Sequence, residues 1–134
     1  MLRKLMIVPY AGEWPEWFPA YLAGIRHLAP LGYTFYFPPA SLVEQRLWNQ
    51  TGLRVSLVGK KLCDVRPLFG RLFEFEIEVG KFDFWGFTDL DCVYGRVEKW
   101  VTDEFLAELD VHSNHHSYVC GPWTLFRTGT TENL

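Results

Sequence analysis

The chain has 134 residues, of which 49% are hydrophobic and 17% aromatic, and its formal net charge is −3. This length suits one domain, and the apolar content is enough for a packed core, which excludes a disordered chain. The balance of charge excludes the strongly basic surface that duplex nucleic acid attracts, so we expect no nucleic-acid partner.

The N-terminal segment and the cysteines indicate where in the cell the protein is expected to lie. The apolar run that ends at Pro9 is too short for a secretory signal and far too short for a membrane span. Cys63, Cys92 and Cys120 are odd in number and widely spaced, which argues against a disulfide framework. We therefore expect a cytoplasmic protein with no membrane span.

The first third of the chain predicts a strand, a helix and a second strand. The apolar residues 5–8 predict a short strand, and residues 9–12 predict a loop because they contain proline and glycine. A helix follows, with Pro15 in its first turn and Gly32 as its stop. The aromatic run at residues 33–37 predicts the second strand.

The middle of the chain predicts two helices and a third strand. Ser41 and Glu44 match a capping box, which predicts a helix over residues 42–48. Residues 53–58 alternate in polarity as a strand does. Apolar residues at three- and four-residue spacing then predict a helix over residues 61–75, with Pro67 within its first turn.

The last third predicts a strand at residues 82–88, a helix at 103–109 with Thr102 as its N-cap, and an extended segment at 118–126. Strands that alternate with helices predict an α/β fold with a mostly parallel sheet and helices on both faces. In such sheets ligands bind beyond the carboxyl ends of the strands. The segments after residues 8 and 88 are therefore the candidate ligand edge.

Asp89 and Asp91 directly follow the strand at residues 82–88. In extended backbone these residues point to the same side, with Cα atoms about 6 to 7 Å apart. A hard divalent cation such as Mg²⁺ or Mn²⁺ would remove the repulsion between the carboxylates and leave positions for substrate phosphates. A solvated acidic turn is the simpler interpretation of the triplet taken alone.

Two other groups of polar residues have both a structural and a functional interpretation. Asp64 and Arg66, near a predicted helix start, suit a helix cap and a surface cation, but they also suit a hydroxyl acceptor and a phosphate-binding guanidinium. The histidines of residues 111–120 and Cys120 suggest zinc, although their spacing matches no common structural zinc pattern and favours a polar loop.

Four segments in order, "VPYAG", "KLCDVRP", "FDFWGFTDLDCVYGRV" and "GPWTLFR", give the chain a family resemblance. Together they resemble a bacterial group of GT-A-like glycosyltransferases of polysaccharide biosynthesis, largely described as a domain of unknown function. The resemblance implies the Rossmann-like, N-terminal half of a GT-A glycosyltransferase fold. It also implies an enzyme that transfers a sugar from a nucleotide diphosphate sugar to a glycan or other hydroxyl acceptor, with Mn²⁺ or Mg²⁺ as cofactor.

The resemblance also implies roles for individual residues. Pro9, Tyr10, Asp64, Arg66 and Asp89 would bind the nucleotide sugar. Asp89 would also bind the metal together with Asp91, and the metal would neutralise the leaving diphosphate. No residue is identified as the catalytic base.

Members of that group are longer, so we expect residues 1–134 to form one nucleotide-sugar-binding domain that is truncated at its C-terminus. The two main functional hypotheses are a metal-dependent glycosyltransferase domain, and a non-catalytic nucleotide-sugar-binding remnant or interaction half-domain that needs a partner. Under either hypothesis the C-terminal edge would be exposed, with Trp100 and Trp123 as candidates for a homodimer or partner surface.

Overall fold

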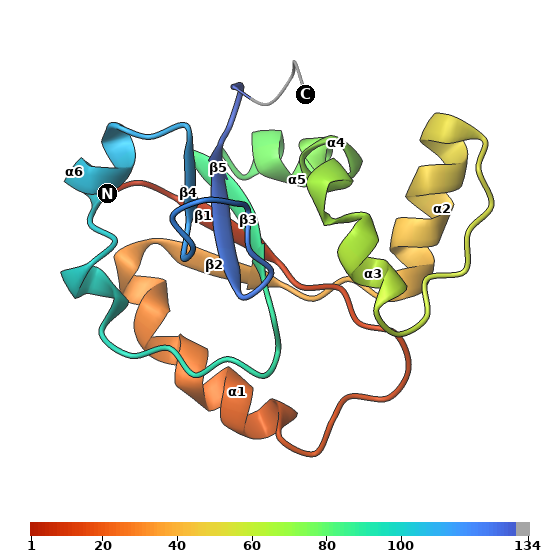
Figure 1. Cartoon of the computed structure of the whole chain (residues 1–134), viewed down its shortest axis with the longest axis horizontal. Coiled ribbons are helices and arrows are strands. Elements are labelled where there is room, and N and C mark those ends of the chain that lie inside the picture. Colours follow the sequence, from red (N-terminus) through yellow and green to blue (C-terminus); the bar gives the residue numbers. More distant parts are fainter. Residues whose placement is uncertain (131–134) are drawn as a thin grey trace.

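Five strands form one mixed sheet in the order β2-β1-β3-β5-β4 in the computed structural model, which describes residues 1–130 (Figure 1). The strands are β1 (Lys4–Ile7), β2 (Tyr33–Tyr36), β3 (Phe84–Thr88), β4 (Val111–Ser113) and β5 (Trp123–Arg127). β1 pairs in parallel with β2 and β3, whereas β5 pairs antiparallel with β3 and with β4. The prediction of a mostly parallel, Rossmann-like sheet is therefore wrong. The two C-terminal strands, β4 and β5, join the sheet through antiparallel pairing.

The helices are short. In chain order they are α1 (Phe18–Ile25), η1 (Arg26–Leu31), α2 (Ala40–Thr51), α3 (Lys61–Asp64), η2 (Arg66–Leu68), α4 (Phe69–Leu72), α5 (Glu74–Val79), η3 (Val97–Lys99) and α6 (Asp103–Ala107), where η denotes a 3₁₀ helix. Within residues 1–130, none of them combines the length and the apolar character that crossing a membrane requires.

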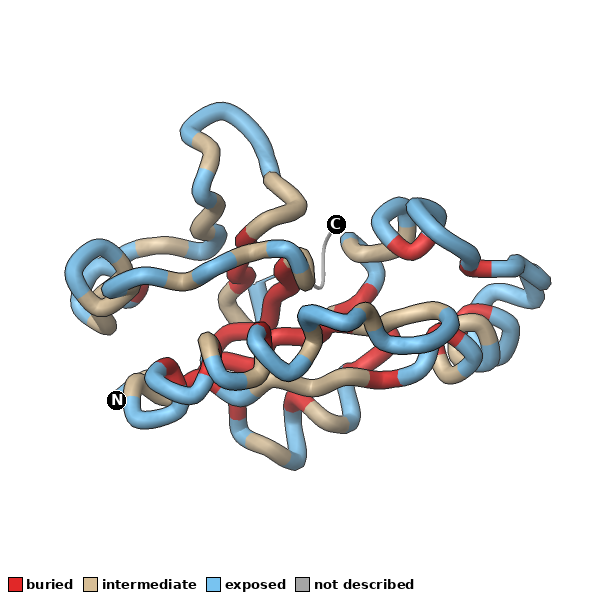
Figure 2. The backbone as a smooth tube through the Cα atoms, turned by 90° about the horizontal axis from the view of Figure 1, so that it is seen from below, coloured by how far each residue is buried: buried red, intermediate tan, exposed pale blue. Residues whose placement is uncertain are grey.

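Helices cover both faces of the sheet. Successive side chains of a strand point to opposite faces, so β1 and β3 contribute apolar residues to two separate clusters. On one face Leu5 and Trp85 pack with α2, α3, α4 and α5. On the other face Met6 and Phe84 pack with η1 and α6. Figure 2 shows the buried residues concentrated along the strands, with exposed chain around them.

The predicted strand at residues 53–58 is wrong, as is the capping box before it. Leu57 is the buried residue of that segment, and its N–H donates to Oε1 of Glu44 at 2.7 Å instead of to a neighbouring strand. Glu44 is therefore engaged away from the helix start. α2 begins after Pro39, without a side-chain cap, so Ser41 lies inside the helix.

The predicted helix over residues 61–75 is broken into separate turns. Val65 and Arg66 end α3 and begin η2, and Pro67, which has no N–H to donate, lies within η2. This break places Arg66 at the junction between α3 and η2. The first helix also differs from its prediction: α1 begins at Phe18, with Pro19 rather than Pro15 in its first turn.

Near the C-terminus, one prediction is confirmed and another only in part. Thr102 caps α6 by accepting a hydrogen bond from the N–H of Phe105 at 3.1 Å, as predicted. The extended segment contains β5, but β5 lies between β3 and β4, so Trp123 is buried while Trp100 stays exposed. β4 was not predicted.

A buried ion pair fastens α6 to β1. The Lys4 side chain is 2% exposed, donates from Nζ to the carbonyl of Leu31 at 3.0 Å and pairs with Asp103. Asp103 also accepts the N–H of Leu2 at 2.7 Å. Burial raises the pKa of Asp103, but the hydrogen bonds from Lys4 and Leu2 lower it further, so this pKa lies below its usual value.

Candidate functional site

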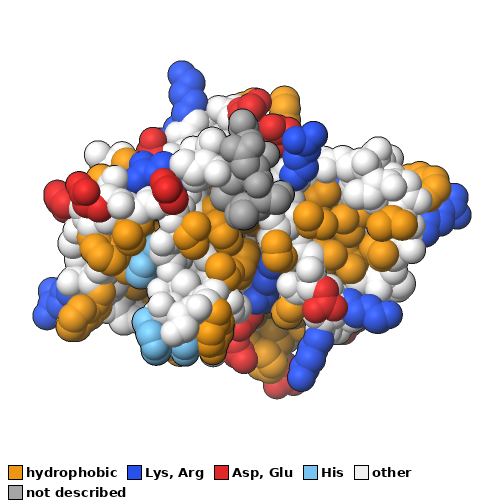
Figure 3. Space-filling model, turned by 45° about the horizontal axis from the view of Figure 1, so that its top comes forward, with side chains coloured by type: hydrophobic (Ala, Val, Ile, Leu, Met, Phe, Trp, Pro, Cys, Tyr) orange, Lys and Arg blue, Asp and Glu red, His pale blue; other side chains and the backbone are white. Residues whose placement is uncertain are grey.

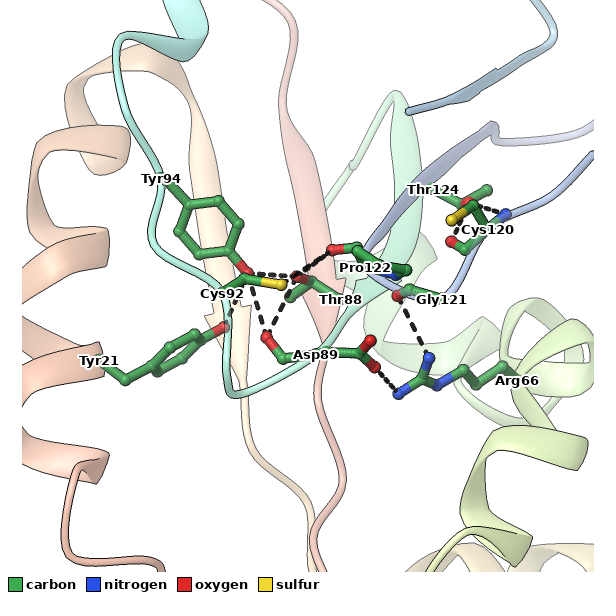
Figure 4. A network of polar contacts seen from close by, with 10 residues as sticks. All are labelled: Tyr21, Arg66, Thr88, Asp89, Cys92, Tyr94, Cys120, Gly121, Pro122 and Thr124. Carbon is green, nitrogen blue, oxygen red and sulfur yellow. Dashed lines mark hydrogen bonds and ion pairs between the residues drawn. The ribbon is translucent and has the colours of Figure 1, made fainter. Parts of the chain in front are cut away.

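The candidate site lies where β3 ends, and it joins three segments that are distant in sequence. Asp89 follows the last residue of β3, Arg66 begins η2, and Gly121 precedes β5. Nη2 of Arg66 lies 2.5 Å from Oδ1 of Asp89, and Nη1 donates to the carbonyl of Gly121 at 3.2 Å (Figure 4). Arg66 is therefore the link between the Asp89 segment and the segment before β5.

The Arg66–Asp89 ion pair is partly shielded from water. The Arg66 side chain is 15% exposed and that of Asp89 31% exposed. The guanidinium lies over the ring of Phe87, 5.3 Å from its centroid. A charge-assisted hydrogen bond in such a setting holds its geometry better than an exposed surface pair does. The buried end of β3 thus fixes the position of the carboxylate that follows it.

Gly121 allows this close assembly because it has no side chain. A Cβ built at this position would lie 2.8 Å from Nη1 of Arg66 and 3.4 Å from Oδ2 of Asp89. Gly95, in the segment after Asp91, has by contrast no neighbour within 4 Å of a hypothetical Cβ in the described part of the chain. In the sequence, Gly121 stands out only as the first residue of the segment "GPWTLFR".

Hydroxyl groups support the site from the other side. Thr88 Oγ1 donates to the carbonyl of Pro122 at 2.6 Å and is in hydrogen-bond contact with the hydroxyl of Tyr94. The Tyr94 hydroxyl also lies 3.3 Å from the carbonyl oxygen of Asp89 and 3.4 Å from the hydroxyl of Tyr21 (Figure 4). Burial raises the pKa of Tyr94 to about 12, so this hydroxyl stays a donor at neutral pH. These hydrogen bonds hold the backbone in place at Thr88 and at the carbonyl of Asp89.

The remaining predicted residues lie around this centre. Asp91 and Asp64 are exposed, and the side chain of neither has a hydrogen-bond or ion-pair partner within residues 1–130. Pro9 and Tyr10 follow β1, the parallel neighbour of β3, so they lie at the same edge of the sheet as Asp89. Among the described contacts, neither of them touches Arg66 or Asp89.

The Tyr10 ring belongs to a separate aromatic group. It stacks on Trp14 with the ring centroids 4.9 Å apart, and Trp14 stacks in turn on Phe18 at 4.1 Å. The backbone N–H of Tyr10 donates to the carbonyl of Pro38 at 3.3 Å, which ties this loop to the end of β2. The aromatic group is thus a fixed part of the same sheet edge.

The donor chemistry of the carboxylates decides whether a metal fits. Within residues 1–130, no group of three or more His, Cys, Asp or Glu side chains is placed to hold a metal ion. Asp91 and the second oxygen of Asp89 are hard oxygen donors, and Mg²⁺ is commonly held by one or two carboxylates together with substrate phosphates. These two side chains thus offer the oxygen chemistry that Mg²⁺ or Mn²⁺ takes, and a bound phosphate would have to supply further ligands.

The histidine loop offers no comparable metal chemistry among the described residues. His112 lies in β4 and packs against the ring of Phe105, with the centroids 5.5 Å apart. Burial lowers its pKa. His115 and His116 lie instead in the loop between β4 and β5. The zinc hypothesis from the sequence gains no support from this arrangement.

A cavity elsewhere contains none of the predicted site residues. It lies between α2 and α4, has a volume of about 480 Å³, and is lined by Leu47, Gln50, Thr51, Leu68, Arg71, Leu72 and Glu74. Three of the seven lining residues are leucines, and its two charged residues, Arg71 and Glu74, have opposite signs. The polar cluster at the end of β3 is therefore the stronger candidate for a ligand that carries charge.

The fold and the site define a mixed α/β domain with an arginine–aspartate pair at the carboxyl end of its central strand. Residues 41–133, more than half of the chain, match a family described as "Family of unknown function (DUF6625)". The chain belongs to this family. The matched range includes Arg66, Asp89, Asp91 and Gly121 but excludes Pro9 and Tyr10. No curated protein and no solved structure matches the chain.

Proposed function

We propose that the site at the end of β3 binds a nucleotide diphosphate sugar and that the chain is a metal-dependent glycosyltransferase domain, which transfers the sugar to an acceptor hydroxyl. The observation that carries this proposal is the Arg66–Asp89 pair packed against a glycine backbone at Gly121. It combines an oriented carboxylate and a partly exposed guanidinium on one edge of the sheet. Sugar and ribose hydroxyls donate to carboxylates, and guanidinium groups bind phosphates.

Each residue then has a physical role. Arg66 holds one oxygen of Asp89, and the other oxygen, which has no hydrogen-bond partner within residues 1–130, can accept a hydroxyl hydrogen bond. Asp91 and this second oxygen would hold Mn²⁺ or Mg²⁺ together with the diphosphate. When bound, the cation supplies positive charge where negative charge develops on the leaving nucleoside diphosphate. Tyr10, at the end of the neighbouring strand, is the proposed contact for the nucleotide, and Asp64 and Pro9 remain predicted contacts.

The alternative is a module that binds a nucleotide sugar without turning it over. It is favoured by one observation: within residues 1–130, no third acidic residue or histidine joins Asp89 and Asp91 as a metal ligand. No residue is assigned as a catalytic base. The two functions differ in turnover, since only the enzyme would hydrolyse or transfer the sugar of a bound donor.

The experiment is a calorimetric titration of the protein with UDP and with GDP, each with and without Mn²⁺, followed by product analysis with the matching sugar nucleotides. We expect binding that requires the metal and is lost in Asp91→Ala. The matched control is Asp110→Ala, which changes an exposed carboxylate outside the site. Absence of metal-dependent binding to any common nucleotide, with Asp91→Ala equal to wild type, would contradict both functions. Nucleotide binding without transfer or hydrolysis of the sugar would support the non-catalytic binding module.

A further inference from the structure

We propose that the stacked rings of His115 and Tyr118 form a platform for the acceptor saccharide; its role as an acceptor site rests on the function proposed above. The ring centroids lie 3.8 Å apart at an interplanar angle of 25°, and His116 stacks on His115 at 4.8 Å. His115 covers one face of the Tyr118 ring, yet Tyr118 is 60% exposed. The other face of this ring is therefore open to a ligand.

The loop that carries these rings is held in place by hydrogen bonds. The N–H of Ser117 donates to Nδ1 of His115 at 3.2 Å. The N–H of Cys120 donates to Ser113 Oγ at 3.0 Å and to Thr124 Oγ1 at 3.2 Å, so the end of the loop is tied to both β4 and β5. A pre-organised aromatic surface loses little conformational freedom on binding, which favours even a weakly held sugar.

The same loop touches the candidate site. Gly121, three residues after Tyr118, accepts a hydrogen bond from Arg66, and Pro122 accepts one from Thr88. Three residues span at most about 11 Å, so the backbone of Tyr118 lies within this distance of Gly121. A donor sugar at Asp89 and an acceptor saccharide at Tyr118 would then bind to neighbouring segments of the chain, which transfer between them requires.

The chemistry of the surface favours a saccharide. One face of a pyranose ring presents C–H groups, which pack on an aromatic face, while its edge presents hydroxyls for polar side chains. His116 and Ser117, exposed residues of the same loop, can bind such hydroxyls. Figure 3 shows histidine side chains gathered at the surface next to hydrophobic ones. By contrast, Trp14 stacks on both Tyr10 and Phe18, so its ring is already engaged.

The test is an NMR titration of the ¹⁵N-labelled full chain with methyl glycosides of glucose, galactose, mannose and N-acetylglucosamine at millimolar concentration. We expect amide shifts across residues 114–121 for at least one glycoside. Tyr118→Ala should weaken its binding about tenfold, as expected for the loss of an aromatic contact. Tyr118→Phe, which keeps the ring, should bind within about twofold of wild type because the stacking surface is unchanged. Trp17→Ala, at another exposed aromatic residue, is the control and should bind like wild type.

Three results would overturn the platform: no glycoside shifts these amides, Tyr118→Ala binds like wild type, or UMP shifts the same amides more strongly than every glycoside. The last result would identify a nucleobase site instead. Asp89→Asn separates the two proposals, since it should lose nucleotide binding and keep glycoside binding. If wild type binds glycosides at this loop but no nucleotide, the proposed function fails and the platform stands as a saccharide site.

Discussion

Gly121→Ala should weaken nucleotide binding while leaving the stability of the fold nearly unchanged. The added Cβ would lie 2.8 Å from Nη1 of Arg66, whereas ordinary contacts between non-bonded heavy atoms begin near about 3.5 Å. The guanidinium must therefore move by roughly 0.7 Å. The clash is with the tip of a flexible side chain, and the Gly121 backbone lies outside the left-handed region, so alanine meets no backbone strain.

The expected effects on binding and stability differ in size. Hydrogen bonds to charged groups contribute about 1.5 to 3 kcal/mol, and displacement of Arg66 weakens those to Asp89 and Gly121. A loss of about 1.4 kcal/mol would weaken nucleotide binding about tenfold. The free energy of unfolding should change by less than about 1 kcal/mol, since replacing glycine also restricts the unfolded chain. Calorimetric titration with UDP or GDP in Mn²⁺ and urea unfolding measure the two quantities.

The matched control is Gly95→Ala, in the segment that follows Asp91. A Cβ at Gly95 has no described neighbour within 4 Å, so this variant should change neither nucleotide binding nor stability. The reasoning is refuted if Gly121→Ala binds nucleotide like wild type while unfolding at the same urea concentration. It is also refuted if Gly95→Ala weakens binding as much as Gly121→Ala does.

Three further predictions concern the supports of the fold and the site. Asp103→Asn should lower the free energy of unfolding by about 3 kcal/mol in urea, because it leaves the buried charge of Lys4 without its partner; an unchanged midpoint would contradict this. Because the pKa of Asp103 is lowered in the folded state, its contribution should be present above about pH 4 and be lost on acidification through the lower folded pKa. Urea titrations between pH 7 and pH 2 should therefore show a smaller acid-induced loss in Asp103→Asn than in wild type. Tyr94→Phe should cost about 1 kcal/mol of stability through its lost contacts with Thr88 and the Asp89 carbonyl, and thermal unfolding checks this against Tyr118→Phe, whose hydroxyl has no described hydrogen bond.

The sequence was sufficient where local signals decide the structure. The apolar runs predicted β1, β2 and β3 close to their observed positions, and Thr102 was recognised as a cap because its side chain acts within one helical turn. Arg66 and Asp89, which the family resemblance selected from separate segments, form an ion pair in the structure. Their role in ligand binding stays a prediction.

The rest depends on tertiary partners that periodicity does not reveal. An extended segment such as β5 pairs in parallel or antiparallel fashion according to the path of the chain, so the orientation of Trp123–Arg127 could not be predicted. Residues 53–58 have the alternation of a strand but no strand to pair with. The role of Gly121 also depends on packing, because only the folded chain brings Arg66 against its backbone.

The most direct test of the central claim, that the end of β3 binds a nucleotide diphosphate with a divalent cation, is paramagnetic broadening of amide signals by Mn²⁺ in the presence of UDP or GDP. We predict that the amides of residues 89–92, 120 and 121 broaden first and only when both nucleotide and Mn²⁺ are present. Broadening that instead centres on the cavity between α2 and α4, or that is unchanged in Asp89→Asn, would contradict the claim.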